Sequence, residues 1–158
     1  MSDTIVIDLG CATYEDYPED ESVLKLIDRF HPSVLFGFDP NPSLVTTAIF
    51  ERGCRVLLER RAAWTYDGFI GFSVDWNRLR GTTGEMMGPA AVPCFDIAKF
   101  IRELPEGELI VKMDIETAEY ELVPHLMSQG VMGRISLLLI EWHGEPLPGP
   151  FDCPVEIW

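Results

Sequence analysis

The chain has 158 residues, and 12 Lys and Arg stand against 26 Asp and Glu, which gives a formal net charge of −14. This length predicts a single domain over residues 1–158, and the composition, 47% hydrophobic and 24% charged, is typical of a globular protein. So acidic a chain lacks a general surface for nucleic-acid phosphates or anionic membranes, so we expect neither as a partner.

The sequence also indicates the cellular compartment in which we expect the protein. It contains no apolar run of about 18 residues that could span a membrane, and no basic and apolar leader at its start. The four cysteines lie far apart and show no paired zinc-ligand spacing; they are Cys11, Cys54, Cys94 and Cys153. We therefore expect reduced thiols in a cytoplasmic protein.

Strand-like and helix-like segments alternate along the chain. Five short apolar segments predict buried strands, at residues 4–9, 34–38, 54–58, 108–113 and 135–142. Apolar residues at helical spacing predict helices at 22–30, 41–53, 97–104 and 116–129. Asn41 and Gly53 are typical of the two ends of a helix, Asp96 is a suitable N-cap, and Pro124 predicts a kink or a division of the last helix.

The intervening segments are less regular. An acidic loop is expected at 13–21, a hairpin at 61–76, a Gly- and Pro-rich irregular stretch at 77–93, and irregular chain from 144 onward. The alternation predicts an α/β fold: a mostly parallel sheet with helices on both faces, which ends after the fifth strand. The hairpin would be inserted after the third strand.

Polar residues gather where the predicted strands end. In strand order they are Asp8, Gly10 and Cys11; Asp39, Pro40 and Asn41; Arg61, Ala62 and Ala63; Asp114, Glu116 and Glu119; and Glu141 and His143. The carboxyl ends of parallel strands share one edge of the sheet, which is where α/β proteins bind ligands. Four of the five ends carry carboxylates, so we expect a ligand site there.

Two of these residues indicate the kind of ligand. An acidic residue at the end of the second strand, here Asp39, can accept hydrogen bonds from ribose hydroxyls. Gly10 allows a ligand to approach the backbone closely. The segment from Gly10 reads GCATY and lacks the GxGxxG pattern that cradles a pyrophosphate. A ligand with a ribose but no phosphate is therefore favoured over a dinucleotide.

Five segments, in this order, resemble one protein family. They are VIDLGC (6–11), GFDPNP (37–42), AAWTYDGFIGFSV (62–74), IVKMDIETAEYELVPHL (110–126) and LLIEWH (138–143). Together they resemble the FkbM-like methyltransferases, a branch of the S-adenosylmethionine-dependent Rossmann-like class. The chain would be a short form, because complete members continue past the fifth strand into two more.

The resemblance implies a Rossmann-like methyltransferase fold, S-adenosylmethionine as cofactor and S-adenosylhomocysteine as product. The acceptor would be a hydroxyl of a sugar, glycan or other small molecule. The resemblance also implies the cofactor contacts: Asp8, Gly10 and Cys11 under the methionine part, Asp39 on the ribose, Pro40, Asn41, Ala62 and Ala63 near the adenine, and Asp114, Glu116 and Glu119 facing the reacting end.

The chemistry needs a group that takes the proton of the acceptor hydroxyl, and Asp114, Glu116 and His143 are the candidates. A magnesium or manganese ion held by Asp114, Glu116, Glu141 and His143 would serve the same end. Spacing does not separate this arrangement from a plain carboxylate cluster, and the sequence assigns no metal ligand.

Other functions stay open. One is a non-catalytic cofactor-binding or interaction module that needs a partner, and another is a nucleotide-sugar or dinucleotide enzyme. A bare sheet edge at 135–142 would also allow two copies to pair as a homo-oligomer.

Overall fold

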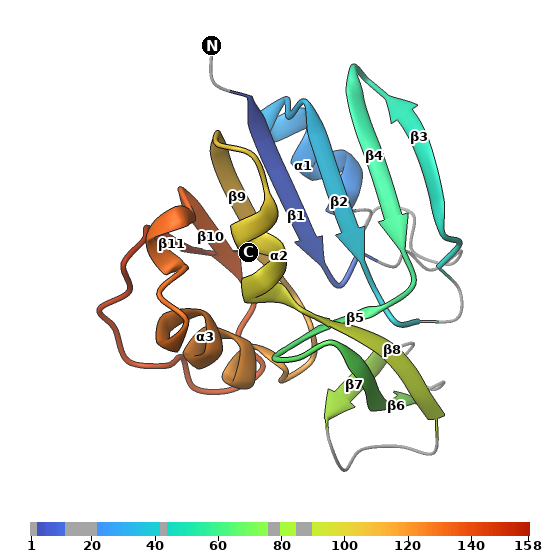
Figure 1. Ribbon diagram of the computed structural model, residues 1–158, viewed down its shortest axis with the longest axis vertical. Helices are drawn as coiled ribbons and strands as arrows, with labels where there is room; N and C mark the ends of the chain where they lie inside the picture. The colour runs from blue at the N-terminus through green and yellow to red at the C-terminus, as the bar shows by residue number, and fades with distance from the viewer. Residues whose placement is uncertain (1–2, 12–21, 42–43, 76–79, 85–89) are drawn as a thin grey trace.

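The computed structural model describes residues 3–11, 22–41, 44–75, 80–84 and 90–158. The predicted acidic loop at 13–21 lies outside these residues. Figure 1 shows a large sheet with helices packed on it and a smaller sheet beyond the carboxyl ends of its parallel strands. No helix in the described ranges combines the length and the apolar character needed to cross a membrane.

The large sheet has seven strands in the order β11-β10-β9-β1-β2-β4-β3. Every neighbouring pair is parallel except β3 and β4. The strands are β1 (Thr4–Leu9), β2 (Val34–Phe38), β3 (Thr47–Glu51), β4 (Cys54–Glu59), β9 (Glu108–Met113), β10 (Leu137–Ile140) and β11 (Val155–Ile157). The predicted α/β class with a mostly parallel sheet is therefore confirmed.

Helices cover both faces of this sheet, as predicted. Side chains alternate along each strand, so Ile5 and Ile7 of β1 face one core and Val6 faces the other. The first core includes α2 (Ile97–Glu103) and α3 (Glu119–Ser128), and the second includes α1 (Ser22–Phe30) (Figure 1). A 3-10 helix, η2 (Met132–Arg134), links α3 to β10.

The smaller sheet lies beyond the carboxyl ends of the parallel strands (Figure 1). Its strands are β5 (Ala62–Trp64), β6 (Gly68–Asp75), β7 (Arg80–Gly84) and β8 (Ala90–Asp96), in the order β5-β8-β6-β7. Extended structure after the third predicted strand is confirmed at 62–64 and 68–75. The predicted hairpin at 61–76 is wrong, because β8 lies between β5 and β6 in the sheet and β6 pairs antiparallel with β7 and β8. Irregular structure at 77–93 is wrong for 80–84 and 90–93, because β6 provides a ladder partner on each side, and residues 77–79 and 85–89 lie outside the described part of the chain. Tertiary pairing here outweighs the local preference of Gly and Pro for loops.

The predicted helix at 41–53 is wrong. Residues 42–43 lie outside the part of the chain that the structure describes, and residues 47–51 form β3, which is antiparallel to β4. Arg52 and Gly53 between the two strands have positive φ, 50° and 86°. Two consecutive positive φ values are typical of a two-residue hairpin turn that matches the twist of the strands. Gly53 therefore serves a hairpin turn, whereas the sequence interpretation placed it at a helix end.

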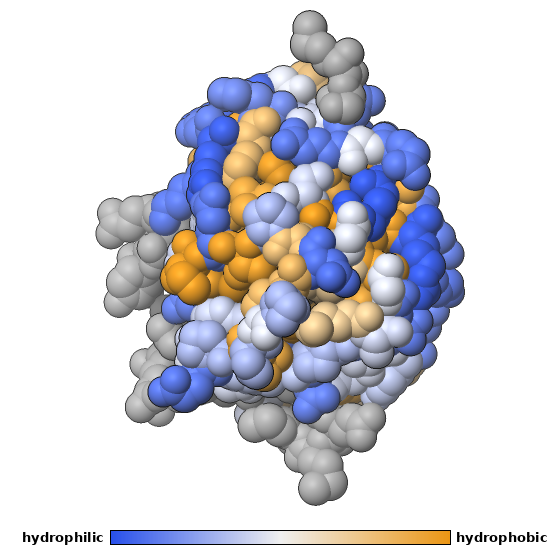
Figure 2. All heavy atoms as spheres, turned by 90° about the vertical axis from the view of Figure 1, so that its left-hand side faces the viewer, coloured by the Kyte–Doolittle hydropathy of each residue, from blue (hydrophilic) through white to orange (hydrophobic). Residues whose placement is uncertain are grey.

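The sheet does not stop after the fifth predicted strand, so that expectation is wrong. β11 pairs parallel with β10, and the end strands of the sheet are β11 and β3. The predicted bare edge at 135–142 is thus covered. Apolar residues of the last segment, Leu147, Phe151 and Val155, pack against the core. Figure 2, which views this side, shows apolar side chains across the middle of the face and hydrophilic ones around them.

A helix cap sets the start of α2, and backbone conformation sets the start of α3. Asp96 is the N-cap of α2, as predicted, and its carboxylate accepts hydrogen bonds from the N–H groups of Ala98 and Lys99. α3 begins three residues later than expected, at Glu119, because Glu116 and Thr117 have positive φ. It is a single helix that includes Pro124.

Candidate functional site

The strand order reverses at β1, which lies between β2 and β9. Ligands of open α/β sheets bind at such a switch point, outside the carboxyl ends of the strands. The loops after β1 and β9 touch there: Asp114 N–H donates to the Leu9 carbonyl oxygen at 3.1 Å. Gly10 has φ 84°, and a Cβ at this position would lie 1.8 Å from the Asp114 carbonyl oxygen. Glycine is therefore required for the two loops to meet.

A buried ion pair lies under these loops. Asp8 of β1 and Lys112 of β9 are register partners, and Lys112 Nζ lies 3.1 Å from Asp8 Oδ1. Nζ also donates to the Gly10 carbonyl oxygen at 3.0 Å and lies 3.7 Å from Asp114 Oδ2. Ser22 Oγ donates to the other Asp8 oxygen at 2.5 Å. Sequence reasoning missed Lys112, although a lysine within an apolar strand is a signal for such a pair.

The net effect of burial and neighbouring charges raises the pKa values of both Lys112 and Cys11. Burial alone would lower the pKa of Lys112, but the charges of Asp8 and Asp114 outweigh it and hold that pKa above its ordinary value. Burial raises the pKa of the Cys11 thiol well above its ordinary value, and the charges of Asp8 and Asp39 raise it further. Cys11 is therefore a neutral thiol near pH 7.

The end of β2 presents Asp39. Its Oδ1 accepts a hydrogen bond from Asn41 N–H at 2.8 Å, and its own N–H donates to the Glu59 carbonyl oxygen at 3.3 Å. The buried Asn41 in turn accepts from Leu44 N–H at 3.0 Å through its carbonyl oxygen. These bonds hold the half-buried Asp39 carboxylate at the carboxyl end of β2.

Ala62 and Ala63 are placed in β5, in the smaller sheet, and both are buried. The Arg61 guanidinium lies 5.1 Å from the ring of Phe38 and 4.3 Å from the ring of Phe95. It therefore joins the end of β2 to β8 through cation–π contacts.

A histidine follows β10 and is held by a buried carboxylate. Glu119, fully buried at the start of α3, accepts from the backbone N–H of His143 at 2.9 Å, and its Oε1 lies 3.2 Å from His143 Nδ1. An anionic Glu119 offers only acceptors, so Nδ1 carries the proton in this contact. In the neutral ring Nε2 then has a lone pair. The side chain of His143 is 11% exposed.

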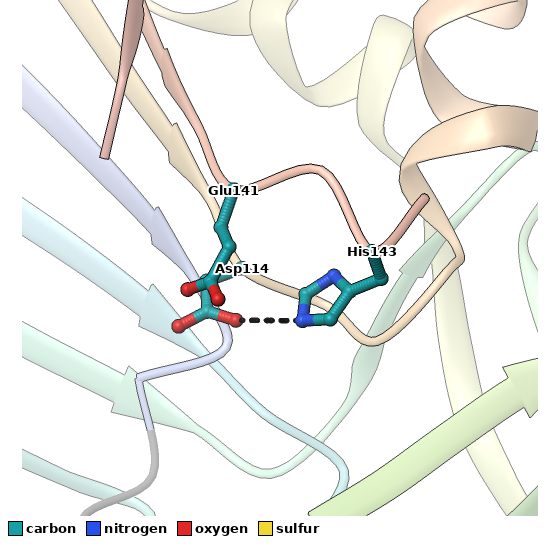
Figure 3. A group of neighbouring side chains, drawn as sticks. All are labelled: Asp114, Glu141 and His143. Carbon is teal, nitrogen blue, oxygen red and sulfur yellow. Dashed lines mark ion pairs between the residues drawn. The ribbon is translucent and has the colours of Figure 1, made fainter. Parts of the chain in front are cut away.

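Carboxylates surround Nε2. Glu116 Oε2 lies 3.5 Å and Asp114 Oδ1 3.6 Å from it. Glu141, at the end of β10, completes the group: one donor atom each from Asp114, Glu141 and His143 all lie within 4.8 Å of one another. Figure 3 shows the three side chains converging from the ends of β9 and β10.

The loop that carries Glu116 has an unusual backbone. Glu116 and Thr117 have φ values of 51° and 83°, a left-handed conformation that costs a non-glycine residue roughly 1–2 kcal/mol. Such strain persists where the surroundings enforce it, and it clusters at functional sites. Here it turns the chain sharply between β9 and α3 and keeps Glu116 beside His143.

The structure thus brings the three predicted catalytic residues, Asp114, Glu116 and His143, into one cluster. Among the predicted cofactor residues, Gly10, Asp39, Pro40 and Asp114 are half-buried, whereas Asp8, Cys11, Asn41, Ala62 and Ala63 are buried. Sequence reasoning did not foresee the roles of Lys112 and Glu119, because each depends on a contact between distant segments.

Comparison of this chain with protein-family models, with curated proteins and with solved structures finds no match.

Proposed function

We propose that the protein is an S-adenosylmethionine-dependent O-methyltransferase with a Rossmann-like fold. The observation that carries the proposal is the switch point at β1. Asp39 stands on one side of it, and the cluster of Asp114, Glu116 and His143 stands on the other. A sugar or another small hydroxyl compound is the acceptor.

The residues at the ends of β1, β2 and β9 suit this cofactor. S-adenosylmethionine supplies a methyl group on a positively charged sulfur. Asp39, half-buried at the end of β2, suits ribose hydroxyls, and Gly10 leaves the backbone open to close approach. The negative charge of Asp114 and Glu116 suits a cation at the ends of β9 and β10. Asp8 has no exposed surface, so we assign it the positioning of Lys112 and the loop after β1.

Three side chains would act on the acceptor. Glu116 takes the hydroxyl proton on a carboxylate oxygen, and the enforced backbone of its loop holds it at this place. Asp114 and His143 orient the hydroxyl, because their Oδ1 and Nε2 atoms lie 3.6 Å apart, close enough for one hydroxyl to contact both. Glu119 fixes the imidazole through Nδ1.

Calorimetric titration with S-adenosylmethionine and S-adenosylhomocysteine tests the proposal. We expect one site per chain with a dissociation constant on the order of 10 μM, weakened roughly 10-fold or more in Asp39→Asn by loss of about 1.4 kcal/mol. Asp152→Asn removes the same charge at an exposed position and is the matched control. It should bind like the wild type.

The outcomes separate the alternatives. Absence of binding by the wild type overturns the proposal. Equal weakening of cofactor binding in Asp39→Asn and Asp152→Asn also overturns it. The ligand would then respond to the total charge of the protein and not to a specific contact with Asp39. Binding without methyl transfer across a screen of hydroxyl acceptors favours the non-catalytic cofactor-binding module.

A further inference from the structure

We propose that Asp114, Glu141 and His143 form a binding site for a divalent cation of the Mn²⁺ type. Two carboxylates and an imidazole suit such an ion, since carboxylate oxygens favour Mg²⁺ and Mn²⁺ and imidazole favours the transition metals. The three residues lie at the carboxyl ends of the neighbouring strands β9 and β10 (Figure 3). The site itself does not depend on the proposed function.

The spacing is close to what one ion requires. Two atoms bound to one ion at about 2.1 Å are at most about 4.2 Å apart. His143 Nε2 and Asp114 Oδ1, at 3.6 Å, already meet this limit. The whole set lies within 4.8 Å, so a movement of each ligand atom by about 0.3 Å brings all three within the limit. At 3.6 Å the Nε2–Oδ1 contact is an ion-pair distance and too long for a hydrogen bond, and both atoms can bind one ion at about 2.1 Å.

Unbalanced polar groups around the triad point to a cation independently of the spacing. Within the described part of the chain, the half-buried Glu141 carboxylate meets no hydrogen-bond donor and no cation. Glu119 brings a further carboxylate to the Nδ1 side of His143, and its Oε2 is buried without a hydrogen-bond partner among the same residues. Lys112 lies 3.7 Å from Asp114, but it is already paired with Asp8 at 3.1 Å. The half-buried carboxylates of Asp114 and Glu141 require a counter-charge, and a divalent ion bound between them and His143 supplies it.

The surroundings of His143 match those of a metal-binding histidine. Metal-bound histidines characteristically donate their second ring N–H to a carboxylate, which fixes the tautomer and the ring. Glu119 occupies this position at 3.2 Å from Nδ1, and it is fully buried. Nε2 is thereby presented to Asp114 and Glu141. Glu119 is a positioning residue of this site.

The role of the ion rests on the proposed function. A cation held by Asp114, Glu141 and His143 would bind the oxygen of the acceptor hydroxyl and make its proton more acidic. The proton then passes to Glu116, whose Oε2 lies 3.5 Å from His143 Nε2.

Electron paramagnetic resonance with Mn²⁺ alone, without cofactor or acceptor, tests the site. Free Mn²⁺ gives a strong six-line signal that falls on binding, so a titration yields affinity and stoichiometry. We expect one Mn²⁺ per chain. Glu141→Gln should weaken binding at least about 10-fold, and Glu119→Gln about 10–100-fold. Glu106→Gln removes the same charge at an exposed position and should bind within about twofold of wild type.

A second readout identifies the ligand. Coupling of Mn²⁺ to an imidazole nitrogen, detected by pulsed methods, should appear in the wild type and vanish in His143→Gln. Thermal unfolding of each variant verifies that it is folded. Several weak sites, equal weakening by Glu106→Gln, or absence of nitrogen coupling would each overturn the site.

The test also separates this site from the proposed cofactor site. Asp39→Asn should bind Mn²⁺ like the wild type, because Asp39 belongs to the end of β2. Mn²⁺ binding by a chain that does not bind S-adenosylmethionine would support the site and overturn the proposed function. S-adenosylmethionine binding without Mn²⁺ binding would do the opposite.

Discussion

At the scale of single residues, the ion pair of Asp8 and Lys112 is the most demanding feature of the fold. Their side chains are 0% and 1% exposed, so both charges have left water. Such a pair persists only when further hydrogen bonds satisfy it, and Ser22 and the Gly10 carbonyl provide them. The pair therefore couples β1 and β9 to the start of α1, beneath the switch point.

Lys112→Met should lower the free energy of unfolding by about 3–5 kcal/mol, because it leaves Asp8 buried without a counter-charge. The control is Lys99→Met, which removes an exposed ion pair with Asp67, each partner 55% exposed. This change should cost less than about 1 kcal/mol. Urea unfolding measures both, and equal losses would contradict the special role of the buried pair.

The same pair predicts a pH dependence. The pKa of folded Lys112 lies above its ordinary value of 10.5, so its contribution to stability is complete below pH 10.5. That contribution is lost as the pH rises through the folded pKa. The stability difference between wild type and Lys112→Met should therefore shrink only above pH 10.5. A difference that shrinks already between pH 7 and 9 would speak against this assignment.

At the scale of elements, one residue joins two helices. Asp96 caps α2, and its Oδ1 also lies 2.9 Å from His125 Nε2 on α3. Burial would raise the pKa of Asp96, but the hydrogen bonds from His125 and from the helix N–H groups prevail and hold it below its ordinary value. One carboxylate thus sets where α2 begins and how it meets α3.

Asp96→Ala should lower the free energy of unfolding by about 1–2 kcal/mol at pH 7, because it removes a helix cap. The folded pKa of Asp96 lies below the ordinary 3.8, so its contribution is present above that pH and is lost as the pH falls through the folded pKa. The deficit of the variant should therefore narrow below pH 3.8. Urea unfolding across pH tests this, with Asp152→Ala as the exposed control. An unchanged deficit at low pH would contradict it.

The elements also show where local patterns suffice. Asp96 followed by an apolar stripe predicted α2 correctly, because a cap acts within its own helix turn. Leu44, Val45, Ala48 and Ile49 have helical spacing, yet 47–51 form a strand. The neighbouring strand β4 and the turn at Arg52 and Gly53 outweigh that spacing, and neither is visible in a local window.

At the scale of the whole molecule, the net charge of −14 makes the stability of the fold depend on salt concentration. A folded chain concentrates this charge, and mutual repulsion then opposes compaction. The free energy of unfolding should rise by on the order of 1 kcal/mol between 10 and 300 mM NaCl, because salt screens the repulsion. Urea unfolding at several salt concentrations measures this. A fall in stability with salt would show that favourable surface ion pairs outweigh the repulsion.

The sequence by itself determined the frame of the protein. The apolar segments that became β1, β2, β4, β9 and β10 identified the parallel strands, since a strand buried on both faces needs a continuous apolar run. Their order along the chain placed Asp39, Asp114, Glu116 and His143 at the ends of strands that share one edge of a parallel sheet.

The tertiary structure decided what depends on partners distant in the chain. β3, β7, β8 and β11 each pair with a neighbouring strand, a pairing that local sequence patterns did not identify. The contacts of Lys112 with Asp8 and of Glu119 with His143 span 104 and 24 residues of the chain. Hydrogen-bond ladders and buried charges are satisfied only by such partners, and local periodicity carries no information about which partner the fold will supply.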